Sequence, residues 1–411
     1  MTCVIAGGGP AGAVLALILA RAGVEVTLLE KHADFLRDFR GDTIHPSTLQ
    51  VLEELGLAER FHDLPHRKTR AIRLWTDRGT ADLASLRGLP GNYDYIAFVP
   101  QWDFLTLVTE AAKECPTFRL IMKAEAHGLI REDGVVRGVR YRTPEGEHEI
   151  RADLVVAADG RTSALRVAAG LVPEELGAPM DVVWFRASRL PGDPDETFLR
   201  LSAGHFMVAI NRDSYWQLAY VIPKGGFDEL KAGGIRALHE PLARLLPFLT
   251  DRLGEIAGFE DVSVLTVAVN RLRRWHVPGL LCIGDAAHAM SPIFGVGINL
   301  AVQDAVAAAN LLAGSLRSGA PIPDSTLALV QKRRLWPTKV TQFAQVVTQN
   351  RVIRPTLGGR PPVPPDISRI PVLGRLVRRF IGLGVRPEHV TVQRLSSPTV
   401  PLRERRGTFN T

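Results

Sequence analysis

Cysteine is scarce in this sequence, and long hydrophobic runs are missing. Its 411 residues include only Cys3, Cys115 and Cys282, which are too few and too scattered for a disulfide framework or a metal site. The early apolar run from Val14 to Ala20 is seven residues long and follows a glycine-rich loop, and no apolar stretch reaches 20 residues. Neither a signal peptide nor a membrane span is therefore supported. We expect a cytoplasmic protein with reduced thiols and no bound metal.

Lysine is absent from the C-terminal segment, although that segment is strongly basic. From Arg351 onward there are twelve arginines and three acidic residues, a charge of +9, whereas the whole chain carries +7. The remainder of the chain is slightly acidic, and we expect no nucleic-acid partner. The sequence is 46% hydrophobic and 23% charged, without internal repeats or low-complexity segments. This composition is typical of a globular protein whose hydrophobic core is large enough for two or three domains.

A glycine fingerprint opens the chain. The β-branched and apolar run from Thr2 to Ala6 predicts a buried strand, and GGGPAG follows it, then a helix, a second strand and Glu30. In this context G-x-G-x-x-G indicates dinucleotide binding, because Gly7 permits the tight turn, Gly9 admits a pyrophosphate and Gly12 allows close packing of helix and strand. The helix N-terminus adds partial positive charge, and Glu30 is placed to accept hydrogen bonds from a ribose.

Another predicted strand, Ile150 to Ala158, ends at Asp159 and Gly160 and turns into a helix with Ser163 and Arg166 in its first turns. This arrangement puts a carboxylate and several N–H groups at the carboxyl edge of a sheet, where open α/β sheets bind ligands. The dipeptide by itself is more often a plain turn.

The stretch from Cys282 to Leu312 combines an apolar strand, a polar corner at Gly284 and Asp285, a glycine-punctuated loop from Pro292 to Gly297, and an alanine-rich helix. The loop is apolar and leads into a helix N-terminus, whose free backbone N–H groups carry partial positive charge. Such a loop is suited to binding a flat, electron-rich ligand. We interpret this ligand as a flavin.

The segment from Asp181 to Asn270 is rich in aromatic residues and predicts a second domain. Short strand candidates separated by turns indicate three or four antiparallel strands, covered by a helix from about Phe227 to Leu253 and followed by a strand from Val262 to Val269. One face of such a sheet can meet a ligand. The sequence leaves open which aromatic or sulfur-containing side chains do so, the candidates being Trp184, Phe206, Met207, Trp216 and Tyr220.

Four separated motifs agree in order and spacing, and together they resemble the class A flavoprotein monooxygenases, the family of para-hydroxybenzoate hydroxylase, phenol hydroxylase and the ubiquinone-biosynthesis hydroxylases. The resemblance spans Thr2 to Gly319. The motifs are GGGPAG at Gly7 to Gly12, Arg40 with the helix after it, the segment from Asp159 to Arg166, and GDAAH from Gly284 continuing into PIFGVGIN.

The resemblance implies an FAD cofactor. Its ribose is expected at Glu30, its pyrophosphate at Gly9, Ala11, Gly12 and Arg40, and its ribityl chain at Asp285. Gln101 and the backbone near Ala126 are expected to add contacts, and the family uses the motif at Asp159 for both FAD and NAD(P)H. The isoalloxazine ring is expected along the loop and helix start, at Pro292, Gly295, Gly297, Ile298 and Asn299.

The implied fold is α/β, with a Rossmann-like FAD-binding domain of residues 1–70, 100–180 and 275–330. Residues 71–99 and 181–274 are expected to form an inserted antiparallel β-sheet substrate domain, and residues 331–411 a C-terminal helical, basic tail. Two departures from the family pattern stand out. Val296 occupies a position where many members carry Gln, and the tail is too short for the thioredoxin-like domain of some polyketide hydroxylases.

The expected activity is hydroxylation of an aromatic, quinone-like or other electron-rich molecule by O2, through a flavin C4a-hydroperoxide, with NADPH or NADH as transient donor. No catalytic acid, base or nucleophile is assigned. We expect His288 to be structural and His45 to be a loop residue. A reductase or halogenase on the same fold, or a non-catalytic flavin-binding protein, remains open, although Leu218 to Pro223 lacks both tryptophans of the halogenase W-x-W-x-I-P signature.

The tail contains an amphipathic stretch, Ile370 to Leu383, with an apolar face and three arginines outside it. Such a helix either docks on its own FAD domain, the commoner outcome, or makes peripheral contact with an anionic membrane. The sequence is compatible with a monomer or a homodimer.

Overall fold

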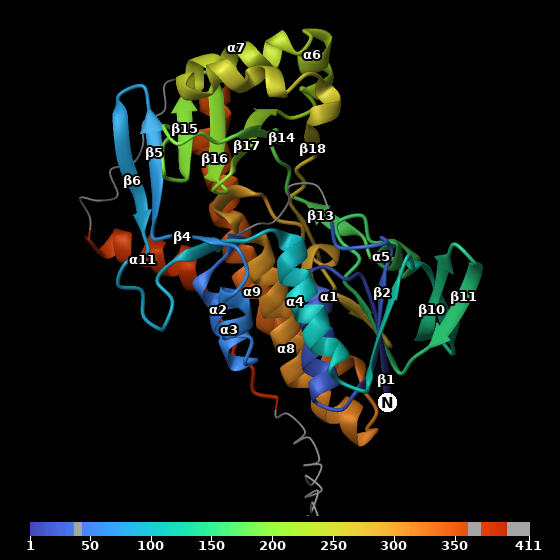
Figure 1. Cartoon of the computed structure of the whole chain (residues 1–411). Coiled ribbons are helices and arrows are strands. Elements are labelled where there is room, and N and C mark those ends of the chain that lie inside the picture. Colours follow the sequence, from blue (N-terminus) through green and yellow to red (C-terminus); the bar gives the residue numbers. More distant parts are fainter. Residues whose placement is uncertain (37–42, 361–370, 393–411) are drawn as a thin grey trace, which may run out of the picture.

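A parallel sheet forms the centre of the first domain in the computed structural model, which describes residues 1–36, 43–360 and 371–392 (Figure 1). Five of its six strands run parallel, in the order β20-β21-β12-β1-β2-β8, and β20 is antiparallel to β21. The strands are β1 (Thr2–Ala6), β2 (Glu25–Glu30), β8 (Phe118–Met122), β12 (Leu154–Ala157), β20 (His276–Val277) and β21 (Leu280–Cys282). The expected Rossmann-like architecture is confirmed.

Helices cover one side of this sheet and a three-stranded sheet covers the other (Figure 1). The helices α1 (Pro10–Arg21), α4 (Gln101–Lys113) and α8 (Gly297–Ser318) share one apolar core with the strands. Helix α8 is apolar and long enough to cross a membrane, but 83% of its most apolar window is buried inside the protein, as in the core helix of a globular domain.

The second layer consists of β9 (Glu125–Glu132), β10 (Val135–Thr143) and β11 (Gly146–Arg151). A turn joins β9 to β10, with Asp133 and Gly134 both at positive φ. The expected strand from Ile150 to Ala158 is two strands instead. Asp153 lies between β11 and β12 and accepts a hydrogen bond from the Thr2 amide, which aligns β12 with β1.

A seven-stranded sheet forms the second domain, in the order β18-β14-β17-β16-β15-β5-β6. The four strand candidates expected between Asp181 and Asn270 are present as β14 to β17, and β18 and the β5–β6 hairpin of the expected segment 71–99 extend the sheet. The sheet is not wholly antiparallel as expected, because β5 pairs with β15 in parallel. The strands are β5 (Ala71–Thr76), β6 (Gly79–Ser85), β14 (Met180–Ser188), β15 (Phe198–Ser202), β16 (His205–Asn211), β17 (Tyr215–Pro223) and β18 (Ser263–Leu265).

Strand alternation sorts the aromatic side chains of this sheet onto two faces. One face packs against helices and contains Met207, Trp216 and Tyr220. The opposite face contains Trp184 and Phe206, which belong to a cluster with Ile293 of the expected flavin loop. The covering helices are α6 (Phe227–Ala232), α7 (Arg236–Leu245) and the 3-10 turns Pro247–Glu255. The expected single helix is therefore broken, by glycines after α6 and by a proline after α7.

Short elements complete the two domains and the connections between them. They are β3 (Thr43–Ile44), β4 (Arg67–Thr69), β7 (Ile96–Phe98), β13 (Pro173–Glu175), β19 (Asn270–Leu272), α2 (Pro46–Glu54), α3 (Ala58–His62) and α5 (Ala164–Ala168). The strand expected from Val262 to Val269 is only the three residues of β18, because the chain then leaves the large sheet to pair β19 with β13.

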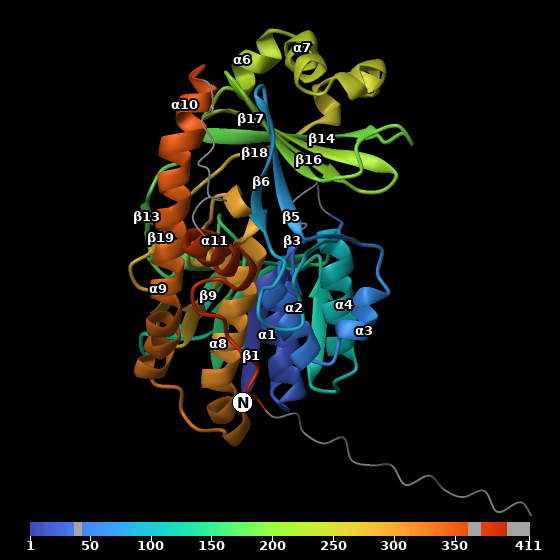
Figure 2. The ribbon, with the colours of Figure 1, turned by 90° about the vertical axis from the view of Figure 1, so that its left-hand side faces the viewer.

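The C-terminal region returns along both domains. Helix α9 (Asp324–Thr348) runs beside α8, and after a π-helical turn at Gln349–Ile353, α10 (Arg354–Leu357) reaches the large sheet (Figure 2). Helix α11 (Pro371–Leu383) packs against β6 and α2, with Ile381 buried and Leu376 exposed. The amphipathic tail helix thus docks on its own protein. Ile370, the first residue of the expected helix, lies outside the described residues.

Candidate cofactor site

The glycine loop between β1 and α1 is shaped by backbone contacts that exclude side chains. Gly7 has φ +102°, and a Cβ atom there would lie 2.3 Å from the carbonyl oxygen of Ala158. A Cβ at Gly12 would lie 2.0 Å from the carbonyl oxygen of Gly7. Glycine is therefore required at both positions by the fold itself. The same contacts place the first fingerprint directly beside the end of β12.

Gly9 differs, because nothing in the structure demands glycine there. Its φ is −71° and its ψ −178°, which any residue adopts, and a Cβ added there would meet no atom of the described residues within 4 Å. Gly9 caps α1, whose first N–H groups lack helical acceptors. A Cβ at Gly297 would likewise meet no described atom within 4 Å, and Gly160, at φ +87°, also borders open space. Three motifs thus border open space with exposed backbone, as a dinucleotide requires.

Glu30 is fixed at the end of β2 by backbone donors. One carboxylate oxygen accepts from the Gly8 amide at 2.8 Å and the other from the His32 amide at 3.0 Å. The side chain is buried, with 2% of its surface exposed. A carboxylate oxygen can accept more than one hydrogen bond, so this geometry is compatible with a ribose hydroxyl as an additional donor.

The turn after β12 is organised by Asp159. Its carboxylate accepts hydrogen bonds from the Ser163 hydroxyl and from the Leu165 amide, the latter at 3.2 Å, and so holds the start of α5. Burial raises the pKa of Asp159, against the effect of these hydrogen bonds. Arg166 is buried as well and donates to the Ala286 carbonyl at 3.1 Å. The Asp159 motif and the GDAAH motif are thereby joined.

Asp285 lies at the junction of three motifs. Gly284, before it, has φ +58°, and a Cβ there would lie 3.0 Å from the Cβ of Ala11 in the first turn of α1. The Asp285 carboxylate meets the Arg161 guanidinium at 3.4 Å and keeps 33% of its side chain exposed. It is therefore a partly free acceptor beside the glycine loop, where the ribityl chain is expected.

The loop from Pro292 to Val296 is held against β3 and α2. The Thr43 hydroxyl donates to the Gly295 carbonyl at 2.8 Å, and the Thr48 hydroxyl donates to the side-chain oxygen of Asn299 at 2.5 Å. Gly295 has φ +65°, and a Cβ there would lie 2.8 Å from the Thr43 hydroxyl. Helix α8 begins at Gly297, so the N–H groups of Gly297, Ile298 and Asn299 lie in its first turn.

The remaining expected contacts are near this assembly. Gln101 opens α4 shortly after Phe98, which pairs with Thr43 in the three-stranded sheet β3-β7-β4. Ala126 on β9 follows Ala124, whose amide donates to the Glu30 carbonyl at 2.9 Å. Arg40 lies outside the described residues.

A buried charged cluster behind the loop was missed by the sequence interpretation. Asp304 of α8 accepts from His288 at 2.6 Å, from the Arg334 guanidinium at 3.0 Å and from the Gly284 amide at 3.1 Å. Burial alone raises the pKa of Asp304, but the charge and hydrogen bonds of His288 and Arg334 hold it below its ordinary value. The sequence did contain a signal for this cluster, because Asp304 is an acidic residue within a largely apolar helix. His288 is part of this scaffold, in agreement with a structural role.

His45 is fully buried at the start of α2. Its Nδ1 lies 2.8 Å from the Ile381 carbonyl, so Nδ1 carries the proton, and Nε2 faces Gly295. Burial lowers the pKa of His45 to about 4, and the ring is therefore neutral at physiological pH. His45 is the loop residue between β3 and α2, as expected, and it also links the tail helix to the flavin loop.

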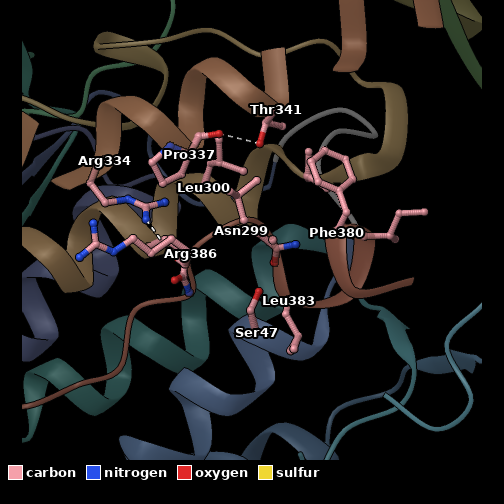
Figure 3. A pocket seen from close by; sticks show the side chains of 14 residues that line it. Ser47, Asn299, Leu300, Arg334, Pro337, Thr341, Phe380, Leu383 and Arg386 are labelled. Atoms are coloured by element: carbon pink, nitrogen blue, oxygen red, sulfur yellow. Dashed lines mark hydrogen bonds between the residues drawn. The ribbon is translucent and has the colours of Figure 1, made fainter. Parts of the chain in front are cut away.

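A small cavity opens beside the first turns of α8 (Figure 3). Leu300 and Pro337 line one side, and Phe380 and Leu383 of α11 line the other. It has room for about one or two water molecules, which is too little for a multi-ring substrate.

The fold and the site define a dinucleotide-binding flavoprotein, and comparison with known proteins agrees. The sequence profile of the FAD binding domain family matches residues 1–344. The chain belongs to this family, and within it to the class A flavoprotein monooxygenases; it is an FAD-dependent enzyme.

Three similar proteins illustrate the range. The 6-methylpretetramide 4-monooxygenase of Streptomyces rimosus is 33% identical over 92% of this chain and 91% of its own length. Digeranylgeranylglycerophospholipid reductase 1 of Methanopyrus kandleri is 29% identical over 73% of this chain and 76% of its own. The structure of pqsL, a probable FAD-dependent monooxygenase from Pseudomonas aeruginosa, superposes with a TM-score of 0.72 at 22% identity, covering 87% of this chain and 98% of that one.

Proposed function

We propose that this enzyme hydroxylates an aromatic or quinone-like small molecule, using O2 as the oxygen source and NADPH or NADH as the electron donor. The bound and reduced flavin supplies the activation of O2. The protein residues hold the cofactor, position the substrate and exclude water. The residues that fit FAD are those assembled around Gly9, Glu30, Asp159, Asp285 and the loop before α8.

The observation that carries the proposal is the apolar face of the large sheet turned toward the flavin loop. Trp184, Phe206 and Val208 lie on this face, and they pack in the same cluster as Ile293 of the loop. A flat, apolar ring is favoured between such walls, because it buries a large area and stacks on aromatic side chains.

Trp184 also offers a polar contact on this face. Its indole N–H is buried and has no hydrogen-bond partner among the described residues. A buried donor without a partner is costly, and a ligand that brings an acceptor relieves that cost. We assign to Trp184 a hydrogen bond to a carbonyl or phenolic oxygen of the substrate.

The relative with 33% identity is named for the monooxygenation of 6-methylpretetramide, which supports oxygenation of a small organic molecule by this enzyme as well. The relatives named as reductases favour a second candidate, in which the same site saturates a double bond. The two activities differ in the product, which gains one oxygen atom in the first case and two hydrogen atoms in the second.

The test is a screen of phenols, quinone precursors and polycyclic aromatics for stimulated NAD(P)H oxidation, with product mass measured for each stimulating compound. A product with one added oxygen supports hydroxylation. Two added hydrogens identify a reductase, peroxide as the sole product identifies an effector, and FAD binding without any NAD(P)H oxidation identifies a non-catalytic flavoprotein.

We also propose a reducing, cytoplasmic setting. Cys3 and Cys282 are unpaired in buried strands of the parallel sheet, and burial raises the pKa of each thiol to about 12. Such thiols are inert packing groups. Mass spectrometry of protein alkylated directly in cell lysates tests this proposal, since a disulfide at any of the three cysteines contradicts it.

A further inference from the structure

Helix α11 lies where the substrate face of the large sheet meets the flavin loop (Figures 1 and 2). Ile381 is 3% exposed and belongs to one cluster with Ile96, Phe98 and Ile210. Ile210 comes from the same sheet face as Trp184, which packs against this cluster too. The tail helix therefore reaches the walls that the proposed function assigns to the substrate.

Phe380 is the residue of α11 that makes an aromatic contact with the flavin loop. Its ring meets that of Phe294 edge to face, with centroids 5.9 Å apart and an interplanar angle of 89°. Phe294 holds φ +69°, which is uncommon for a residue with a side chain. Phe380 also lines the small cavity at the foot of the loop, opposite Leu300 (Figure 3).

The helix is held in this position at its C-terminal end. At the cofactor end, the Ile381 carbonyl accepts from His45, which in turn faces Gly295. Beyond the helix, the buried carboxylate of Glu388 accepts from Arg333 at 2.8 Å and pairs with Arg334, which also holds Asp304. These contacts tie the tail to the GDAAH motif.

We propose that α11 is the substrate-selecting wall of this enzyme and that Phe380 sets the size of the ring system that reaches the flavin loop. This inference rests on the proposed function, because it concerns the same substrate site. Phe380 acts by occupying space, so its removal joins the small cavity to the substrate region. Larger ring systems then fit, and small ones lose contact area.

The experiment compares Phe380→Ala with Leu376→Ala. Leu376 is on the same helix but 60% exposed, so its variant controls for loss of an apolar side chain from α11. A series of phenols with one to four fused rings is measured in two ways. Ligand binding is followed by perturbation of flavin absorbance, without turnover, and steady-state kinetics give KM, kcat and the fraction of NAD(P)H lost to peroxide.

In Phe380→Ala, we expect binding of the smallest wild-type ligand to weaken about tenfold, binding of the next larger ring system to strengthen, and peroxide formation to rise as water enters. Leu376→Ala keeps wild-type values. The inference is overturned if Phe380→Ala keeps the ligand-size preference of the wild type. It is also overturned if Leu376→Ala changes this preference as much as Phe380→Ala does, or if no phenol binds. If ligands bind with this size dependence but none is hydroxylated, the proposed function is wrong, but the inference that α11 selects ligands by size is supported.

Discussion

In the variant Gly9→Ala, the added methyl group enters the open space in which the glycine loop is expected to receive the FAD pyrophosphate. The backbone there is extended, and no described atom lies within 4 Å of the new Cβ. Alanine is slightly worse than glycine as a helix cap but lowers the entropy of the unfolded chain. These effects oppose one another, and the free energy of unfolding of the apoprotein should change by less than about 1 kcal/mol.

The cofactor is affected far more. A methyl group at Gly9 displaces the pyrophosphate from the N–H groups that start α1, and two lost charge-assisted hydrogen bonds cost about 3 kcal/mol or more. This corresponds to about a hundredfold weaker FAD binding. The matched variant Gly7→Ala should behave in the opposite way and unfold more easily by at least about 3 kcal/mol, because strain at φ +102° adds to a clash with Ala158.

Two measurements separate these effects: urea unfolding of the apoproteins and FAD titration followed by quenching of flavin fluorescence. Wild-type FAD affinity in Gly9→Ala refutes the placement of the pyrophosphate. A loss of apoprotein stability in Gly9→Ala as large as in Gly7→Ala refutes the argument that Gly9 serves the ligand and not the fold.

Three further predictions concern the site and its scaffold. Asp285→Ala should bind FAD more weakly with an unchanged urea midpoint, since its ion pair is long and partly exposed; retention of FAD as tight as in the wild type contradicts the ribityl assignment. Glu388→Gln should cost about 3 kcal/mol in urea unfolding, because it leaves buried Arg334 without its full partner, whereas Glu114→Gln, at an exposed pair, should cost less than about 1 kcal/mol; equal costs contradict this. Because the pKa of His45 falls to about 4 on folding, its contribution is present above pH 6.5 and is lost as pH falls toward 4. Between pH 7 and pH 5 the wild type should lose about 2 kcal/mol more than His45→Gln, and parallel pH profiles of the two proteins contradict the assignment.

The local elements around the cofactor could be predicted from the sequence because their signals are local. The GGGPAG turn, the strand before it and Glu30 after it lie within one contiguous segment, and the structure has them as β1, α1 and β2. The glycine requirements at Gly7 and Gly12 follow from close backbone approaches that any βαβ unit of this kind needs.

The parts that the sequence could not supply depend on pairing between distant segments. The parallel pairing of β5 with β15 joins residues that lie far apart in the chain, such as Arg73 and Phe198, and no periodicity in either strand encodes its neighbour. The tail is similar. Its amphipathic pattern predicted a helix with one buried face, but not that Ile381 would meet His45 or that Glu388 would complete the charged cluster of Asp304.

The orientation of the sheet residues was also undecided until the register was known. Alternation alone allows Trp184 or Trp216 to face the flavin loop, since a shift of one residue exchanges the two faces. The structure pairs Trp184 with Ala219 and buries Trp216 under the helices. The candidate substrate contact followed from that register.

The most direct test of the central claim is the origin of the oxygen atom in the product. The enzyme with bound FAD is incubated with NADPH or NADH and a phenol that stimulates its oxidation, under 18O2 in ordinary water, and the product is analysed by mass spectrometry. A monooxygenase incorporates one 18O atom per product molecule and consumes one NAD(P)H for it. A product whose added oxygen comes from water, or a product that gains hydrogen without oxygen, contradicts the account.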